Sequence, residues 1–211
     1  MKNQNFENML MGKPYISDDY CQELMLDAKR KLYKFNNFDF QGDDWKQRLD
    51  ELIIDVLDSV GENITVLPPF HCDFGKNIKV GKNFFANYNL TILDVAEVII
   101  GDNVFIAPNV SIYTAGHPIH PKARNSMYEY GIPITIGDDC WIGGSVLICP
   151  GVNIGKGTVI GAGSVVTCDI PENVVAAGNP CRVLRKITDD DIKYYFKKRE
   201  FSVEEMKKIS G

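Results

Sequence analysis

The chain has 211 residues, a formal net charge of −5 and an isoelectric point of about 5.2. Its length allows one core with appendages, its acidic charge argues against nucleic-acid binding, and it has no apolar run long enough to span a membrane. Because its six cysteines form no CxxC pair, we expect free thiols and a cytoplasmic protein without a membrane partner.

Residues 1–61 predict helices and show no internal repeat. Residues 17–19, Ser-Asp-Asp, form a cap and an acidic first turn for a helix that runs to Phe35. A second helix carries an apolar stripe over residues 45–60 and is closed by Gly61. We expect this helical segment to pack as a cap on the rest of the chain.

Between residues 134 and 175 an aliphatic residue recurs at every sixth position, namely at Ile136, Ile142, Ile148, Ile154, Ile160 and Val166. A period of six fits neither an amphipathic helix nor an alternating strand, and it predicts a solenoid of short strands with inward-pointing aliphatic side chains. Glycine follows most of these residues, which predicts corner backbone that a Cβ atom would strain. The pattern begins near Val80 and changes phase by two residues around residues 98–100, where an irregularity is expected.

Residues 113–133 interrupt the repeat with a polar segment rich in Pro and Gly, which predicts a loop protruding from the solenoid. Loops on rigid scaffolds commonly carry functional residues. His117 lies there between Gly116 and Pro118. A lone histidine is commonly structural, but an imidazole with an ordinary pKa of about 6.5 suits proton abstraction from a hydroxyl at neutral pH.

Several segments resemble the maltose and galactoside O-acetyltransferases of the hexapeptide-repeat family: residues 68–75 (PPFHCDFG), 85–94 (FANYNLTILD), 106–110 (IAPNV), 114–118 (TAGHP), 134–143 (ITIGDDCWIG) and 178–183 (GNPCRV). The resemblance implies a mainly β fold, a left-handed parallel β-helix over residues 62–187. The helical segment 1–61 precedes it, and a charged tail, 188–211, follows with a short helix after Asp189. The general rule for parallel crossovers would have predicted the opposite hand.

The same resemblance implies the transfer of an acetyl group from acetyl-CoA to a hydroxyl of a sugar or glycoside, of the maltose, glucose or galactoside type. His117 corresponds to the catalytic base. The acceptor hydroxyl would attack the thioester directly, without a covalent enzyme intermediate. The residues implied for the acceptor are Asp19, with Asp18 as an equal alternative, Asp73, Asn87, Asp94 and Glu129. No metal is required for this reaction.

For the cofactor, the resemblance implies Trp141, Gly144, Ala162, Thr167, Arg182 and Arg185, with the Gly144 amide stabilising the oxyanion. Two positions depart from the family pattern. Gly144 stands where serine is frequent. Cys168 stands where lysine is frequent, so the phosphate contact of that lysine is absent or is made by Lys186. The family also implies a homotrimer in which His117 and Trp141 reach one site from different subunits.

Three alternatives accompany this interpretation. A related branch of the family acetylates streptogramin or chloramphenicol-type antibiotics, and another acetylates serine. Some hexapeptide-repeat proteins are zinc-dependent carbonic anhydrases with three histidine ligands, and this chain has His71, His117 and His120, although the last two are too close in sequence for that arrangement. A non-catalytic scaffold is the third alternative, which the ordered loop disfavours.

Overall fold

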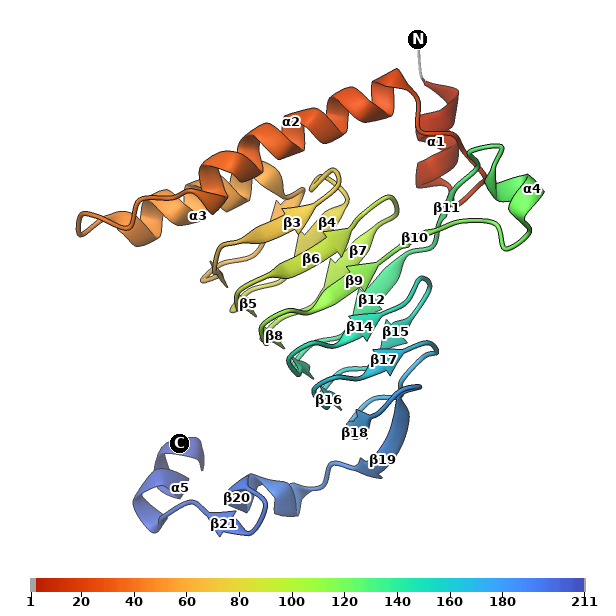
Figure 1. Cartoon of the computed structure of the whole chain (residues 1–211). Coiled ribbons are helices and arrows are strands. Elements are labelled where there is room, and N and C mark those ends of the chain that lie inside the picture. Colours follow the sequence, from red (N-terminus) through yellow and green to blue (C-terminus); the bar gives the residue numbers. More distant parts are fainter. Residues whose placement is uncertain (1–2, 211) are drawn as a thin grey trace.

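The computed structural model describes residues 3–210 and consists of three parallel β-sheets wound into one solenoid (Figure 1). The first sheet contains β1 (Ser59–Val60), β4 (Ile78–Val80), β7 (Val98–Ile100), β12 (Ile134–Ile136) and β15 (Asn153–Ile154). The second contains β2 (Thr65–Val66), β5 (Phe85–Ala86), β8 (Phe105–Ile106), β13 (Trp141–Ile142), β16 (Val159–Ile160) and β18 (Val174–Ala177). The third contains β3 (Phe70–Cys72), β6 (Leu90–Leu93), β9 (Ser111–Tyr113), β14 (Leu147–Ile148) and β17 (Val165–Val166). The predicted mainly β, parallel solenoid is confirmed.

The interior consists of stacked aliphatic side chains, one ladder for each sheet. Ile106 pairs in register with Ile142, which pairs with Ile160, and all three are fully buried. Burial of each such side chain contributes about 1.5–3 kcal/mol of hydrophobic stabilisation. The result is a rigid rod whose corners hold their positions in space.

The length of the coils changes along the solenoid. Partners in register are 20 residues apart in the first coils, as in Val80 and Ile100, and 18 apart later, as in Ile136 and Ile154. The additional residues lie at the third corner, which joins the third sheet to the first through residues 73–77 and 94–97. The predicted irregularity near residues 98–100 is therefore the end of a longer corner.

Glycines follow the aliphatic residues for a reason other than the predicted one. None of Gly137, Gly143, Gly155 and Gly161 has a positive φ. A Cβ atom on Gly137 would instead lie 2.7 Å from the backbone nitrogen of Lys156 in the next coil. The expectation of strained corner backbone is wrong for these glycines, because the constraint is the close approach of neighbouring coils.

Asparagines provide the left-handed backbone at the first corner, between the first and second sheets. Asn63, Asn83 and Asn103 have φ values of 56°, 56° and 55°. The Asn63 amide donates to the Asn83 side chain and the Asn83 amide to the Asn103 side chain, each at 2.8 Å. Asn tolerates this conformation better than most residues, so these side chains both permit the corner and bond it to its neighbours.

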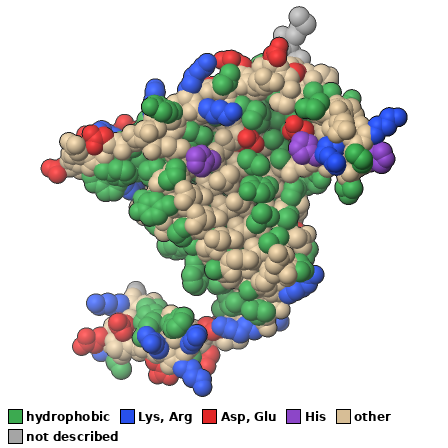
Figure 2. Space-filling view, viewed as in Figure 1, with side chains coloured by type: hydrophobic (Ala, Val, Ile, Leu, Met, Phe, Trp, Pro, Cys, Tyr) green, Lys and Arg blue, Asp and Glu red, His purple; other side chains and the backbone are tan. Residues whose placement is uncertain are grey.

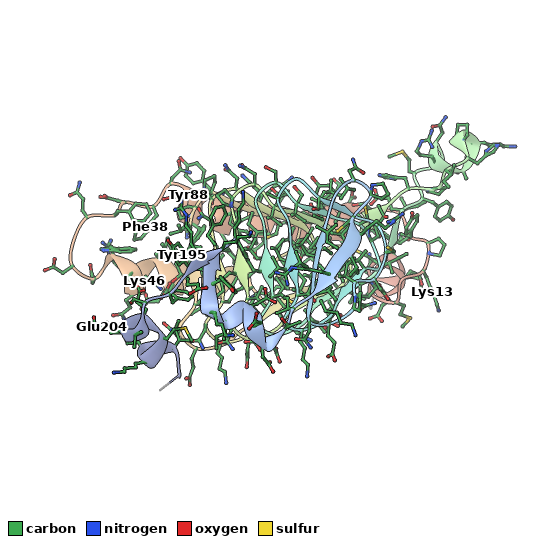
Figure 3. All side chains as sticks on the ribbon, turned by 90° about the horizontal axis from the view of Figure 1, so that it is seen from below. Lys13, Phe38, Lys46, Tyr88, Tyr195 and Glu204 are labelled. Atoms are coloured by element: carbon green, nitrogen blue, oxygen red, sulfur yellow. The ribbon has the colours of Figure 1, made fainter. Side chains whose placement is uncertain are left out.

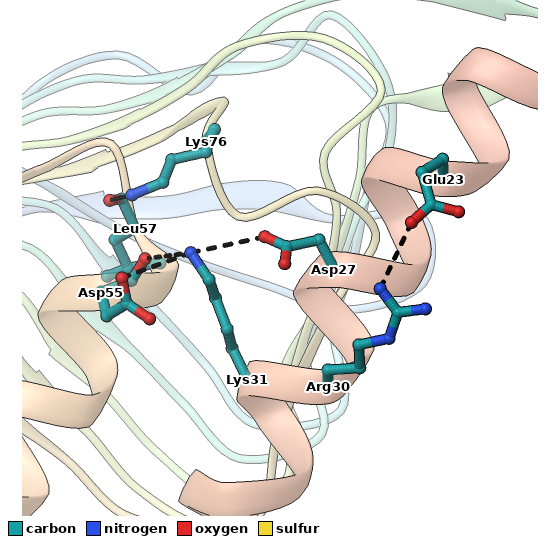
Figure 4. A network of polar contacts seen from close by, with 7 residues as sticks. All are labelled: Glu23, Asp27, Arg30, Lys31, Asp55, Leu57 and Lys76. Atoms are coloured by element: carbon teal, nitrogen blue, oxygen red, sulfur yellow. Dashed lines mark hydrogen bonds and ion pairs between the residues drawn. The ribbon is translucent and has the colours of Figure 1, made fainter.

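Three helices, α1 (Gln4–Leu10), α2 (Asp19–Asn36) and α3 (Trp45–Val56), precede the solenoid, and α2 and α3 cover its first coil. Figure 4 shows Lys31 of α2 joined to Asp55 of α3 at 3.2 Å and to Asp27 at 3.4 Å. The predicted second helix was too long. It ends at Val56, and Val60 lies in β1 because its side chain belongs to the ladder that continues at Val80.

An extension leaves the solenoid between β9 and β12. It contains β10 (Ala115–Gly116), helix α4 (Pro121–Arg124) and β11 (Tyr130–Gly131), with β10 and β11 antiparallel. Figures 1 and 3 show α4 projecting well beyond the sheets. Because the sequence before and after the extension stays in register with the repeat, the solenoid continues unbroken beneath it.

The tail begins with β19 (Arg182–Lys186), which pairs antiparallel with β18. The 3₁₀ helix η1 (Asp189–Lys193), the hairpin of β20 (Tyr194–Phe196) and β21 (Arg199–Glu200), and α5 (Val203–Ser210) follow. A capping box joins Ser202 and Glu205, since each residue's backbone amide donates to the other's side chain. The six cysteines are free thiols, of which Cys168 is exposed. Within residues 3–210, no helix combines the length and apolar character needed to cross a bilayer.

Candidate functional site

The third corner holds a buried carboxyl group. Asp94 is fully buried, and its Oδ1 accepts hydrogen bonds from the backbone amides of Asp73 and Phe74, each at 2.9 Å. Its Oδ2 has no hydrogen-bond partner in the described part of the chain. Burial raises the pKa of Asp94 to about 7, and the neighbouring Asp73 adds to this rise. No part of the Asp94 side chain is exposed in the single chain, and its predicted contact with an acceptor stays a prediction.

Asp73 lies in the preceding coil and is half-buried. Burial raises the pKa of Asp73 to about 6, with Lys29 opposing the rise and Glu129 adding to it. Its carboxylate is therefore close in space to charges from both the N-terminal helices and the extension. Unlike Asp94, it retains surface from which to contact a ligand.

Glu129 joins the extension to the N-terminal segment through Tyr15. The Tyr15 hydroxyl donates to Glu129 Oε2 at 2.8 Å, and the backbones of the two residues exchange hydrogen bonds of 3.1 and 2.9 Å. Burial and this hydrogen bond raise the pKa of Tyr15, so the phenol stays a donor. We call Tyr15, Asp73, Asp94 and Glu129 the acidic cluster.

The strand that leads to His117 is fixed by a buried threonine. Thr114 is fully buried, its hydroxyl donates to the Leu93 carbonyl at 2.7 Å, and the same oxygen accepts from the Ala96 amide at 3.0 Å. These bonds tie the start of the extension to the two residues that flank Asp94 and Val95 in the chain. Thr114 and Tyr15 were not among the predicted site residues, although Thr114 lies in a segment of the family resemblance, 114–118.

His117 follows directly after β10 and is exposed. Its neighbour Gly116 packs on the ring of Tyr130, where a Cβ atom would lie 2.5 Å from the phenol oxygen. Figure 2 shows a histidine side chain beside acidic and basic side chains where the extension leaves the solenoid. His117 therefore directly follows a short strand that pairs with Tyr130, the chain neighbour of Glu129, and its side chain is exposed.

The second corner, between the second and third sheets, carries Asn87, Gly144 and Ala162. One coil, that of β8, separates Asn87 from Gly144, whereas Gly144 and Ala162 are in successive coils. Asn87 Oδ1 accepts from the Tyr88 amide at 2.8 Å. Neighbouring amides are used within the solenoid, since Gly143 donates to Ile160 and Gly163 donates to Gly144. The amides of Gly144 and Ala162 donate to no atom of residues 3–210 and are free donors along this corner.

The predicted cofactor residues lie on the second sheet and around its lower end. Trp141 is 55 % exposed on β13, and Thr167 is exposed just after β17. Arg185 is held by Asp191 through two hydrogen bonds of 2.8 Å, which lower the pKa of Asp191 to about 2. Arg182 donates only to its neighbouring Cys181 carbonyl, at 2.8 Å. The guanidinium of Arg182 is therefore more available to a phosphate than that of Arg185.

Asp18 and Asp19 have different environments. Asp18 caps α2, with Oδ1 accepting from the Cys21 amide at 3.1 Å and Oδ2 accepting from Asn3 and Asn5 at 2.9 and 3.1 Å. The Asn3 hydrogen bond is the largest of the interactions that lower the pKa of Asp18 to about 2. Since both oxygens of Asp18 have partners, the exposed Asp19 is the better candidate to reach an acceptor.

The other two histidines have distinct positions. His71 is exposed on β3, and His120 caps α4 by accepting a hydrogen bond from the Lys122 amide at 3.2 Å. Among residues 3–210, no three His, Cys, Asp or Glu side chains are grouped to hold a metal ion.

The predicted site residues thus form two groups in one chain. Asp73 and Glu129 lie with His117 near the third corner, whereas Asn87, Gly144 and Ala162 follow the second corner. Figure 3, a view from below, shows Tyr88, the neighbour of Asn87, on the opposite side of the molecule from α4. The third sheet separates the two groups, so a single chain does not bring them together.

Comparison with known proteins identifies similar sequences and structures. Residues 133–168 match the family model described as bacterial transferase hexapeptide (six repeats). The chain is 49 % identical to the galactoside O-acetyltransferase of Escherichia coli (strain K12) over 194 residues, which cover 90 % of this chain and 93 % of that protein.

Two solved structures are also similar. A galactoside acetyltransferase in complex with coenzyme A has a TM-score of 0.89 and 46 % identity, covering 95 % of this chain and all of that one. A maltose O-acetyltransferase from Clostridium difficile 630 has a TM-score of 0.85 and 49 % identity, covering 89 % and 99 %. Sequence, coil geometry and these similarities agree, and the chain belongs to the galactoside and maltose O-acetyltransferase family of hexapeptide-repeat transferases.

Proposed function

We propose that the chain transfers the acetyl group of acetyl-CoA to a hydroxyl of a sugar or glycoside, with His117 as the general base. The observation that carries this proposal is the exposed imidazole of His117 on a strand tied to the acidic cluster by Thr114. The complex of a similar galactoside acetyltransferase with coenzyme A supports the choice of cofactor.

The proposed reaction is a direct displacement. His117 takes the proton of the acceptor hydroxyl while that oxygen bonds to the thioester carbonyl carbon. The carbonyl oxygen becomes negatively charged and accepts a hydrogen bond from the free Gly144 amide. The carbon–sulfur bond then breaks, the thiolate takes the proton from the His117 imidazolium, and the acetylated sugar and CoA thiol leave.

Acceptor binding uses hydrogen-bonding side chains around the imidazole. Asp19, Asp73 and Glu129 accept from sugar hydroxyls, and Asn87 both accepts and donates. Asp94 acts through Asp73 by holding the backbone of the third corner.

Cofactor binding follows the second sheet and its corner. Trp141 and Ala162 line the pantetheine, Thr167 contacts it further along, and Arg182 meets the phosphates. Arg185 contributes through a guanidinium already oriented by Asp191, with Lys186 beside it as a second cation.

The proposed active form is a homotrimer in which the third corner of one subunit faces the second corner of the next. Exposed aromatic side chains on the second sheet support an interface there. Phe105 and Trp141 are 53 % and 55 % exposed, and the rings of Phe85 and Phe105 lie 6.2 Å apart. An exposed apolar surface of this kind is typical of a face that another molecule covers.

The test is thiol release from acetyl-CoA with maltose, glucose, a thiogalactoside, and a panel of streptogramin and chloramphenicol antibiotics. We expect release with sugars and none with antibiotics. His117→Ala is expected to lower kcat by about 10²–10⁴-fold, while acetyl-CoA affinity stays within a few-fold. His120→Ala is the matched control and keeps activity. Loss of acetyl-CoA binding in His117→Ala, or full turnover by it, would contradict the assignment.

A further inference from the structure

A cleft runs between α2 and the outer face of the third sheet, beside the acidic cluster. Its α2 wall includes Lys29, Tyr33 and Asn37, and its solenoid wall includes His71, Asp73 and Leu93. The Tyr33 side chain is 71 % exposed. The cleft thus combines an aromatic ring and an apolar leucine with four polar side chains, three of which are exposed.

The walls of this cleft are firmly held. Asn36 donates to the Phe70 carbonyl at 2.9 Å and accepts from the Phe70 amide at 2.8 Å, so that α2 is bonded to the edge strand β3 on both backbone groups. A cleft with fixed walls loses little conformational entropy when a ligand binds.

Its polar groups are largely available to a ligand. Lys29 has no ion-pair partner within residues 3–210. Asn37 Nδ2 donates to the Tyr33 carbonyl at 2.8 Å, which leaves Oδ1 as an acceptor. His71 is exposed on β3. The cleft therefore offers both donors and acceptors to a ligand.

Asp73 connects this cleft to the proposed acceptor site. It lines the cleft and is also coupled electrostatically to Glu129 of the acidic cluster. A molecule that contacts Asp73 from the proposed acceptor site is therefore beside the cleft that Lys29 and Tyr33 also line.

We infer that this cleft binds the second ring of a disaccharide acceptor whose first ring is acetylated beside His117, an inference that rests on the proposed function. A hexose ring presents hydroxyls for the amide, imidazole and ammonium groups, and a C–H face for the Tyr33 ring. A phosphate group fits less well because the Asp73 carboxylate repels it, and a purely apolar aglycone leaves Lys29 and Asn37 without partners.

The test compares kcat/KM for maltose and glucose in the full-length protein. We expect the wild type to prefer maltose. Lys29→Ala and Tyr33→Ala should each lower kcat/KM for maltose by about tenfold, because each removes roughly one hydrogen bond or ring contact. The value for glucose is expected to stay within twofold. Lys34→Ala, on the same helix but outside the cleft, is the matched control and keeps both values. Equal losses for both sugars, or no loss, would overturn the subsite.

A second measurement separates this inference from the proposed function. Maltose and glucose binding is measured by calorimetry on His117→Ala, with and without Lys29→Ala. Weaker maltose binding only in the double variant supports the cleft as a sugar site even if wild type releases no thiol. Unchanged maltose binding overturns the subsite while leaving sugar acetylation intact.

Discussion

At the scale of single residues, the site depends on buried polar groups that face the backbone instead of the substrate. Asp94 and Thr114 accept hydrogen bonds from amides on both sides of the third corner, and Thr114 also leads into the strand of His117. No sequence pattern marks these two side chains as supports of the corner. The repeat shows which positions point inward, but it does not show which of those positions lie at a longer corner. The histidine and the neighbouring glycine were predictable, whereas these supports required coordinates.

The raised pKa of Asp94 predicts that the stability of the fold depends on pH. Its pKa rises from the ordinary 3.8 to about 7 on folding, so the folded chain binds more protons than the unfolded chain between these values. Its contribution to the free energy of unfolding is therefore present at low pH and is lost as the pH rises from about 4 to about 7. Asp94→Asn should flatten this slope in urea denaturation followed across that range.

The control for Asp94→Asn is Asp189→Asn at an exposed position in the tail. Asn keeps one oxygen for the two amides but leaves a buried amide nitrogen, so a uniform loss of stability is also expected. An unchanged slope in Asp94→Asn would show that folding does not raise the pKa of this carboxyl.

At the scale of elements, a six-residue period predicted the strands because each inward side chain needs a partner in the next coil. The period did not predict the end of α3, since Val60 continues both the helical stripe and the ladder at Val80. It also gave the wrong cause for the glycines. The spacing of residues within one coil carries no information on the distance between neighbouring coils. It is the short distance to the next coil that leaves no room for a Cβ atom at Gly137.

Gly137→Ala tests this close approach. Its backbone conformation suits alanine, but the added Cβ would press on the Lys156 backbone and on the 2.8 Å bond from Gly137 to Ile154. We expect a loss of about 1–3 kcal/mol in the free energy of unfolding. Gly144→Ala is the control for stability, because the nearest atom to its Cβ is 3.4 Å away. Equal stability of the two variants would mean that the coils separate without cost.

At the scale of the whole molecule, the residues of the proposed site lie at two separate corners of one chain. The third corner supplies an imidazole and carboxyl groups, and the second corner supplies free amides and Asn87. A rigid rod cannot bend to join them, because the ladders of the third sheet lie between. Which residues share a site is therefore a property of the assembly, and neither the period nor the fold of one chain determines it.

Subunit complementation tests this shared site. His117→Ala and Asn87→Ala are each expected to be trimeric by light scattering and nearly inactive alone. After unfolding and refolding as an equal mixture, about a quarter of the sites should pair an intact His117 with an intact Asn87 from the next subunit, restoring about a quarter of wild-type turnover. The matched control mixes His117→Ala with Asp73→Ala, whose residues lie near the same corner. This mixture should stay inactive, because every site then carries one of the two changes. No recovery in either mixture, or stable monomers, would place the whole reaction within one chain.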